Sequence, residues 1–153
     1  MNAFVRNVYQ LVWSTKYRAP VLVKEDRMRL FAYISSLLEN KNCECHAVGG
    51  VDDHIHIVTH IHQTIAVATL VKDIKLATHD FLRDEGLCRG FAAWQRGYAA
   101  LSYHVSAVED LKAYVRNQEL HHADRASDYK RELMALLDEH KVLYDENYLD
   151  CRA

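Results

Sequence analysis

The stretch VDDHIHIV, residues 51–58, decides the interpretation of this chain. Its β-branched residues follow an acidic turn and predict a strand over 54–61. Successive side chains of a strand point to opposite faces, so the two isoleucines are expected to face the core and His54 and His56 to point away from it. Residues two apart in a strand are separated by about 6.5 Å, which lets both imidazoles reach one metal ion.

A second histidine pair, His60 and His62, follows on the same face of the same strand. Paired histidines in a strand can also be solvated or hydrogen-bonded without any metal. Position favours the first pair, because it begins the strand beside Asp53, whose carboxylate can orient an imidazole from behind. Of the two pairs, His54 and His56 are therefore the better candidates for metal ligands, with Asp53 as their support, and the second pair is peripheral.

Length and composition indicate one domain. The chain has 153 residues, of which 50% are hydrophobic and one is proline, enough for one buried core and too few for two typical domains. No apolar run approaches the 18 residues of a membrane span, and the first ten residues lack the pattern of an export signal. We expect a cytoplasmic protein in which residues 1–153 form one domain, without a membrane partner, and with its cysteines as reduced thiols.

Charge is distributed unevenly along the chain. The net charge of −2 argues against a nucleic-acid partner, because overall basicity is the usual footprint of one. Residues 1–30, however, hold six Lys or Arg against two acidic residues, and residues 109–150 hold eleven acidic residues against six basic ones. This distribution permits a polyanion site on one side, although a charged run is also typical of a solvated face.

The order of predicted elements indicates an α+β fold. Alternating and β-branched runs predict strands, and apolar residues spaced three and four apart predict helices, with Thr64 and Ser106 as N-caps. The expected strands are 4–14, 43–49, 54–61 and 91–105, and the expected helices are 24–40, 65–84, 107–122 and 127–140. This order predicts a ferredoxin-like βαββαβ split sandwich with additional C-terminal helices.

The predicted helix 107–122 carries Tyr114 and Gln118 four residues apart. Residues at this spacing lie on one face of a helix, about 6 Å apart along its axis. The amide oxygen of Gln118 is a candidate metal ligand, and the hydroxyl of Tyr114 is a candidate nucleophile. On spacing alone, packing of the tyrosine and solvation of the glutamine are the more common explanation of such a pair.

Several spaced motifs together resemble one known family. They are WSTKYRAP at 13–20, DHIH at 53–56, WQxGY at 94–98, Tyr114-x-x-x-Gln118 followed by two histidines, and YDExYL at 144–149. Their order and spacing are similar to those of the single-tyrosine transposases of the smallest insertion sequences (IS200-like), which belong to the HUH superfamily. The likeness runs from about residue 9 to residue 149, although Asp52 stands where relatives more usually have proline.

The resemblance implies a chemistry and an assembly. It implies that His54, His56 and Gln118 bind a divalent cation and that Tyr114 attacks single-stranded DNA, forming a 5′-phosphotyrosine and a free 3′-hydroxyl. It also implies recognition of hairpins near the element ends, and a homodimer in which the tyrosine helix can complete the partner's site. Phosphate chemistry favours Mg²⁺ or Mn²⁺ as the ion. Candidates for DNA phosphate contacts are Lys16, Arg18 and Lys75.

Two alternatives remain open at this stage. One is a domesticated endonuclease that acts on repeated chromosomal hairpins through the same residues. The other is a ferredoxin-like regulatory dimer without catalytic activity, in which the histidines bind Zn²⁺ structurally. The second alternative predicts metal binding without cleavage of single-stranded DNA.

Overall fold

The computed structural model describes residues 3–123 and 128–149. The strands are β1 (Val8–Ser14), β2 (Cys45–Gly50), β3 (His54–His60) and β4 (Ala99–Tyr103), and the helices are α1 (Lys24–Asn40), α2 (Val67–Glu85), α3 (Val108–Arg116), α4 (Gln118–His121) and α5 (Tyr129–Glu139). Short 3₁₀ turns cover Lys16–Arg18, Val105–Ala107 and Glu146–Leu149.

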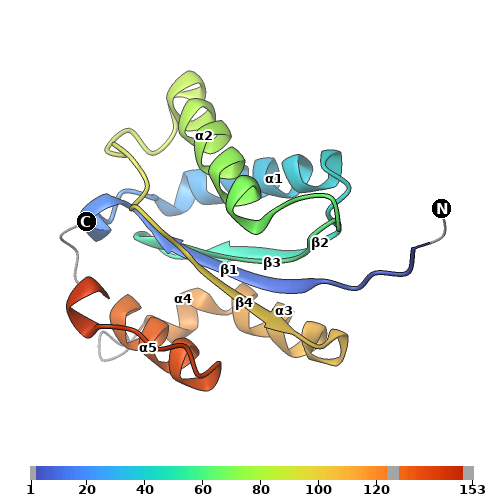
Figure 1. Cartoon of the computed structure of the whole chain (residues 1–153). Coiled ribbons are helices and arrows are strands. Elements are labelled where there is room, and N and C mark those ends of the chain that lie inside the picture. The colour runs from blue at the N-terminus through green and yellow to red at the C-terminus, as the bar shows by residue number, and fades with distance from the viewer. Residues whose placement is uncertain (1–2, 124–127, 150–153) are drawn as a thin grey trace.

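The four strands form one sheet in the order β2-β3-β1-β4, with every neighbouring pair antiparallel. Strands β1 and β2 therefore run parallel to each other on either side of β3, and α1 connects them across the sheet. This is the split βαβ arrangement of a ferredoxin-like fold, and the predicted α+β fold class is confirmed (Figure 1).

Helices cover both faces of the sheet (Figure 1). Helices α1 and α2 lie on one face, where Ile55 and Ile57 pack into the main hydrophobic core with Leu30, Ile34 and Leu70. Helices α3, α4 and α5 lie on the opposite face and cover His54 and His56. The two pairs of side chains separate onto opposite faces as the alternation predicts, but the histidine face is a second buried layer.

A glycine allows the helix that carries Tyr114 to lie directly on the sheet. A Cβ added at Gly49 of β2 would lie 2.2 Å from the backbone oxygen of Val115 in α3. Any other residue at this position would push α3 outward, because backbone atoms cannot yield as a flexible side chain can. Gly49 therefore sets the height of the tyrosine helix above the sheet.

Two predicted elements are shorter than expected. The predicted strand 91–105 forms only as β4, because Gly97 has a positive φ of 80° and Trp94 makes an isolated bridge to Thr15. The predicted helix 107–122 breaks at Asn117, whose φ of −98° and ψ of 20° separate α3 from α4. The predicted helix 127–140 forms as α5, and residue 127 lies outside the described residues.

The predicted N-caps are wrong in both places. Helix α2 begins at Val67, and Thr64 instead hydrogen-bonds the ring of His62. At the start of the 3₁₀ turn before α3, the side chain of His104 accepts from the backbone N–H of Ser106. In both cases the hydroxyl that the sequence pattern assigns to the cap instead contacts the ring of a nearby histidine.

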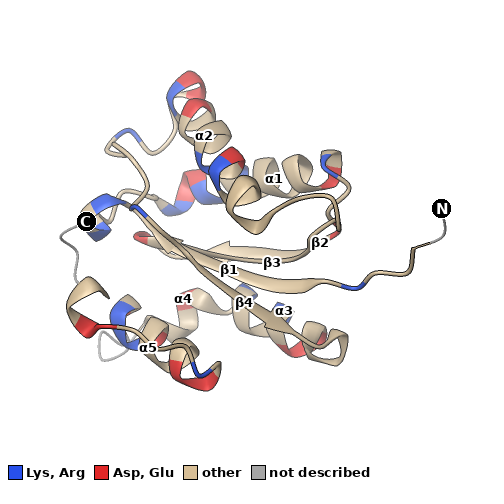
Figure 2. Ribbon diagram, in the orientation of Figure 1, with Lys and Arg blue, Asp and Glu red and all other residues tan. Residues whose placement is uncertain are grey.

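The fold neutralises much of the basic N-terminal segment. Arg27 and Lys24 form ion pairs with Glu119, at 2.8 Å and 3.3 Å, and Arg29 pairs with Glu85. Figure 2 shows these charges mixed over α1 and α2 rather than gathered in one basic patch. In this view the basic residues of the N-terminal segment therefore do not form one continuous basic patch.

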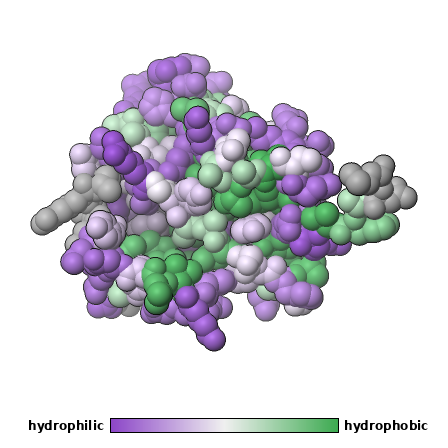
Figure 3. Space-filling model, in the orientation of Figure 1, coloured by the Kyte–Doolittle hydropathy of each residue, from purple (hydrophilic) through white to green (hydrophobic). Residues whose placement is uncertain are grey.

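None of the described helices is both long and apolar enough to cross a membrane. In the view of Figure 3, hydrophobic residues gather around the middle of the visible face, between hydrophilic residues above and below. Strand β4 is an edge of the sheet and has a neighbour on one side only. Unpaired edges of this kind favour association with another chain.

Candidate metal and nucleophile site

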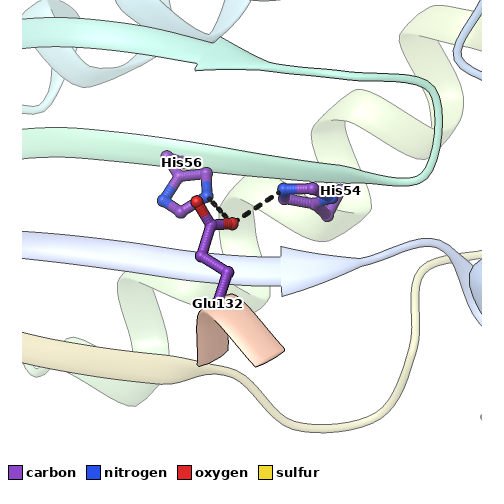
Figure 4. A group of neighbouring side chains, drawn as sticks. All are labelled: His54, His56 and Glu132. Atoms are coloured by element: carbon purple, nitrogen blue, oxygen red, sulfur yellow. Dashed lines mark hydrogen bonds and ion pairs between the residues drawn. The ribbon is translucent and has the colours of Figure 1, made fainter. Parts of the chain in front are cut away.

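Two histidines and a glutamate meet on the buried face of β3 (Figure 4). The Nε2 atoms of His54 and His56 lie 3.1 Å and 2.9 Å from Oε1 of Glu132, which projects from α5. One ligand atom from each residue lies within 4.8 Å of the others, and all three residues are buried. Two imidazole nitrogens and a carboxylate oxygen form a donor set that suits a divalent metal.

The second nitrogen of each imidazole has an oxygen partner. Nδ1 of His54 lies 2.7 Å from Asp53, and Nδ1 of His56 lies 2.7 Å from the side-chain oxygen of Gln10. Gln10 is in turn held by the hydroxyl of Tyr103, to which its amide donates at 3.0 Å. Contacts of this kind fix the ring orientation of metal-binding histidines, so both Nε2 atoms are aimed at Glu132.

Tyr114 and Gln118 join the same cluster despite the break between α3 and α4. The hydroxyl of Tyr114 donates to Oε2 of Glu132, and the amide of Gln118 donates to the same oxygen at 2.9 Å. The amide oxygen of Gln118 lies 3.1 Å from Nε2 of His54, and the ring of Tyr114 lies 5.8 Å from that of His56. The structure thus brings four predicted site residues together within one chain.

The second histidine pair lies outside this cluster. His60 is partly exposed, and its Nδ1 accepts from the backbone of Asn7 at 3.2 Å. His62 follows the end of β3 and contacts Thr64 at 2.7 Å. Neither histidine approaches Glu132, in agreement with their predicted peripheral position.

Glu132 was not predicted from the sequence. It lies within the apolar stripe of α5, among the buried residues Tyr129, Leu133, Leu136 and Leu137. A charged residue on the buried face of an amphipathic helix is costly unless it is paired. That mismatch was the available signal, but His54 and His56 are more than seventy residues away in the sequence, and no local pattern connects them to Glu132.

Contacts within the cluster shift the pKa values of its members in different directions. Burial alone lowers the pKa of His54, but the contacts with Asp53 and Glu132 outweigh it and raise the pKa to about 9. Burial also lowers the pKa of His56, and the contact with Glu132 offsets this lowering only in part. Burial tends to raise the pKa of Glu132, and its contacts with three histidines, one of them His122, drive it well below its usual range.

Tyr114 is held in its protonated form. Burial, followed by the hydrogen bond to the Glu132 carboxylate and its charge, raises the pKa of Tyr114 well above its ordinary value. A tyrosine that donates to a carboxylate is a poor nucleophile until the negative charge beside it is neutralised. Neutralisation of the Glu132 carboxylate would therefore lower the pKa of Tyr114.

The raised pKa of His54 predicts a pH dependence of stability for the metal-free protein. The folded pKa of about 9 exceeds the ordinary value of 6.5, so the charged form stabilises the fold fully below pH 6.5 and the effect is lost as pH rises through 9. We expect the free energy of unfolding in urea with EDTA to fall by up to about 3 kcal/mol across this window. His54→Gln should flatten the slope, and an unchanged slope in that variant would contradict the assignment.

The three candidates for DNA contacts lie in different environments. Lys75 donates to the carbonyl oxygens of Gln95 and Gly97, at 2.9 Å and 2.6 Å, on the α1 and α2 side of the sheet. Its ammonium group holds the segment before β4 and lies across the sheet from the histidines. Lys16 is exposed, whereas Arg18 stands over the ring of Tyr129 at 5.7 Å, beside the site.

The chain matches one known protein family over most of its length. The sequence matches the family described as "Transposase IS200 like" over residues 4–118, which is most of the chain. The chain belongs to the IS200-like transposase family, and this membership supports the function of a DNA-processing transposase. Helix α5 and Glu132 lie beyond the matched residues.

Two solved structures share the fold. One is a protein of Deinococcus radiodurans R1 provisionally described as a transposase, with 22% identity, a TM-score of 0.60, and coverage of 77% of this chain and 95% of that one. The other is a REP-associated tyrosine transposase bound to a REP hairpin, with 14% identity, a TM-score of 0.57, and coverage of 80% and 72%. None of the curated proteins matches the chain.

Proposed function

We propose that this chain is a metal-dependent transposase that cleaves and rejoins single-stranded DNA at hairpin-marked ends through a tyrosine intermediate. One observation carries the proposal. The hydroxyl of Tyr114 and the Nε2 atoms of His54 and His56 all contact the same carboxylate, that of Glu132. A candidate nucleophile and a candidate metal-binding group thus share one position, which suits cleavage of a phosphodiester.

The reaction follows from the groups that meet there. The oxygen of Tyr114 attacks the phosphorus, the bond from phosphorus to the 3′-oxygen breaks, and the tyrosine proton is lost while the 3′-oxygen gains one. The 5′-phosphotyrosine keeps the energy of the broken bond, so the 3′-hydroxyl of another strand can attack it and rejoin DNA without ATP. An unperturbed tyrosine is ionised at about one part in a thousand at pH 7, an activation deficit of roughly 4 kcal/mol.

The residues that would hold the cation are His54, His56 and Glu132, with the Gln118 amide oxygen beside them. A divalent ion bound there, which we propose to be Mg²⁺ or Mn²⁺, would neutralise charge on the scissile phosphate and on Glu132. Asp53 and Gln10 keep both imidazoles oriented. The site then offers Tyr114 an environment in which its phenolate is no longer opposed by an unneutralised carboxylate.

The test is formation of a covalent adduct. The protein is incubated with a pool of single-stranded hairpin oligonucleotides carrying randomised flanks, with Mg²⁺ or Mn²⁺ and in parallel with EDTA. We expect a denaturation-resistant protein–DNA adduct only with the metal. Metal binding without any adduct would instead favour a regulatory metal-binding dimer.

Homodimerisation is part of the proposal, and its effect on the site can be tested. Within one chain, Tyr114 already lies beside its own His56, so we expect each site to be complete within a protomer in this conformation. A mixture of Tyr114→Phe protein with His54→Ala, His56→Ala protein should then remain inactive. Labelled subunits are used to monitor subunit exchange. Recovery of cleavage after exchange would instead establish a site shared between chains.

A further inference from the structure

A cavity of about 660 Å³ opens beside the metal-binding group. Its wall includes Asp53, His122 and Tyr129. Asp53 holds Nδ1 of His54, and the ring of Tyr129 lies 4.7 Å from the His54 ring. The cavity therefore begins directly at the His54 end of the site, and its size is that of a small-molecule site.

Tyr114 lies at the other end. It lines a separate cavity of about 350 Å³ together with His121 and Glu132, on the side of His56. In phosphoryl transfer the attacking and leaving oxygens lie roughly in line through phosphorus. A phosphate attacked from the Tyr114 end therefore expels its 3′-oxygen toward the His54 end, where the larger cavity opens.

We propose that this cavity binds the nucleoside on the 5′ side of the scissile phosphate and selects a base that carries an exocyclic amino group. The inference rests on the proposed function, because it takes Tyr114 as the nucleophile. It adds to that function a subsite and a determinant of sequence preference, which is the carboxylate of Asp52.

The charge of the cavity favours a base over a phosphate. Its two arginines are already engaged, since Arg27 pairs with Glu119 and donates to the backbone of Leu22, and Arg18 donates to the backbone of Leu149. The other charged side chains of the wall are the carboxylates of Asp52, Asp53, Glu119 and Asp128, which disfavour a phosphate. The apolar side chains of Pro20 and Val51 also line it and suit the faces of a base.

Asp52 is the carboxylate left to read the base edge. Asp53 is bound to His54, and Asp128 caps α5 by accepting from Arg131. The side chain of Asp52 is exposed and has no hydrogen bond or ion pair within the described part of the chain. Its backbone oxygen accepts from Leu22 at 2.9 Å, which fixes the turn. An ionised carboxylate only accepts, so it matches the amino donors of cytosine, adenine or guanine, whereas the one N–H of the free thymine edge lies between two carbonyl oxygens that repel a carboxylate.

The first test is a titration followed by NMR, which does not depend on cleavage. The full chain is titrated with dGMP, dCMP, dAMP and dTMP, each of which carries the 3′-hydroxyl of the expelled nucleotide. We expect shifts centred on residues 51–53 and Tyr129, with Kd at least fivefold lower for the three amino-bearing nucleotides than for dTMP. Equal affinity for all four, or shifts elsewhere on the protein, would overturn the proposal.

The matched variants are Asp52→Asn and Asp84→Asn. Asp84 is an exposed carboxylate of α2 and does not line the cavity, so its loss should leave the preference unchanged. Asp52→Asn should bring dTMP to within twofold of the others, because an amide can also donate. Retention of the full preference in Asp52→Asn would reject Asp52 as the determinant.

Cleavage of the randomised pool separates this inference from the proposed function. We expect thymine to be depleted at the base immediately 5′ of the cut in wild-type products, and the depletion to fall at least fivefold with Asp52→Asn. Nucleotide preference without any cleavage would reject the nuclease and leave the base-selective cavity standing. Cleavage without preference at this base would reject the subsite and leave the nuclease standing.

Discussion

Tyr114→Phe is expected to abolish strand cleavage and the covalent adduct while binding of hairpin DNA stays within about twofold of the wild type. The substitution removes one oxygen, which is the only atom that can become bonded to phosphorus. The half-buried ring keeps its packing against His56 and His121. Gel analysis of the adduct and a binding titration on the same substrate measure the two effects separately.

The matched control for this variant is Tyr103→Phe. Tyr103 is also a partly buried tyrosine on the same face, and its hydroxyl accepts from Gln10, which supports His56. Its loss should weaken cleavage without removing the adduct. An adduct that persists in Tyr114→Phe and disappears in Tyr103→Phe would move the nucleophile to Tyr103 and overturn the assignment.

The fold was predictable because each element carries its own local pattern. The alternation in residues 54–60 and the apolar spacing in α1 and α2 are consequences of side-chain direction in strands and helices. The short β4 and the break at Asn117 were not predictable by this route. They depend on a positive φ at Gly97 and on contacts of Gln118 with residues distant in sequence.

The site was predictable to the extent that it lies in local motifs. His54 and His56 are neighbours on one strand, whereas Glu132 meets them only because α5 folds back over the same face. Lys75 shows the opposite case. The sequence suggests it as a contact for DNA phosphates, but in the structure its ammonium group donates to two backbone carbonyls.

Alanine substitutions at four histidines should separate into two classes. His54→Ala or His56→Ala is expected to lower the affinity for Mn²⁺ by more than about 100-fold and to abolish metal-dependent cleavage. Loss of a residue that only hydrogen-bonds to a metal ligand costs up to about 100-fold. His60→Ala and His62→Ala should leave both near the wild-type level, because their rings contact Asn7 and Thr64 instead. Calorimetry with Mn²⁺ and the adduct assay measure the two properties, and circular dichroism confirms that each variant folds. Equal losses at all four positions would reject the choice of pair.

The same measurement identifies the third ligand, for which the sequence favours Gln118 and the structure also offers Glu132. If the carboxylate binds the ion, Glu132→Gln should lower Mn²⁺ affinity more than Gln118→Ala, because the negative charge is lost and the shape of the side chain is kept. If the amide oxygen binds instead, Gln118→Ala should cause the larger loss. Unchanged Mn²⁺ affinity in Glu132→Gln would show that Glu132 is not a ligand.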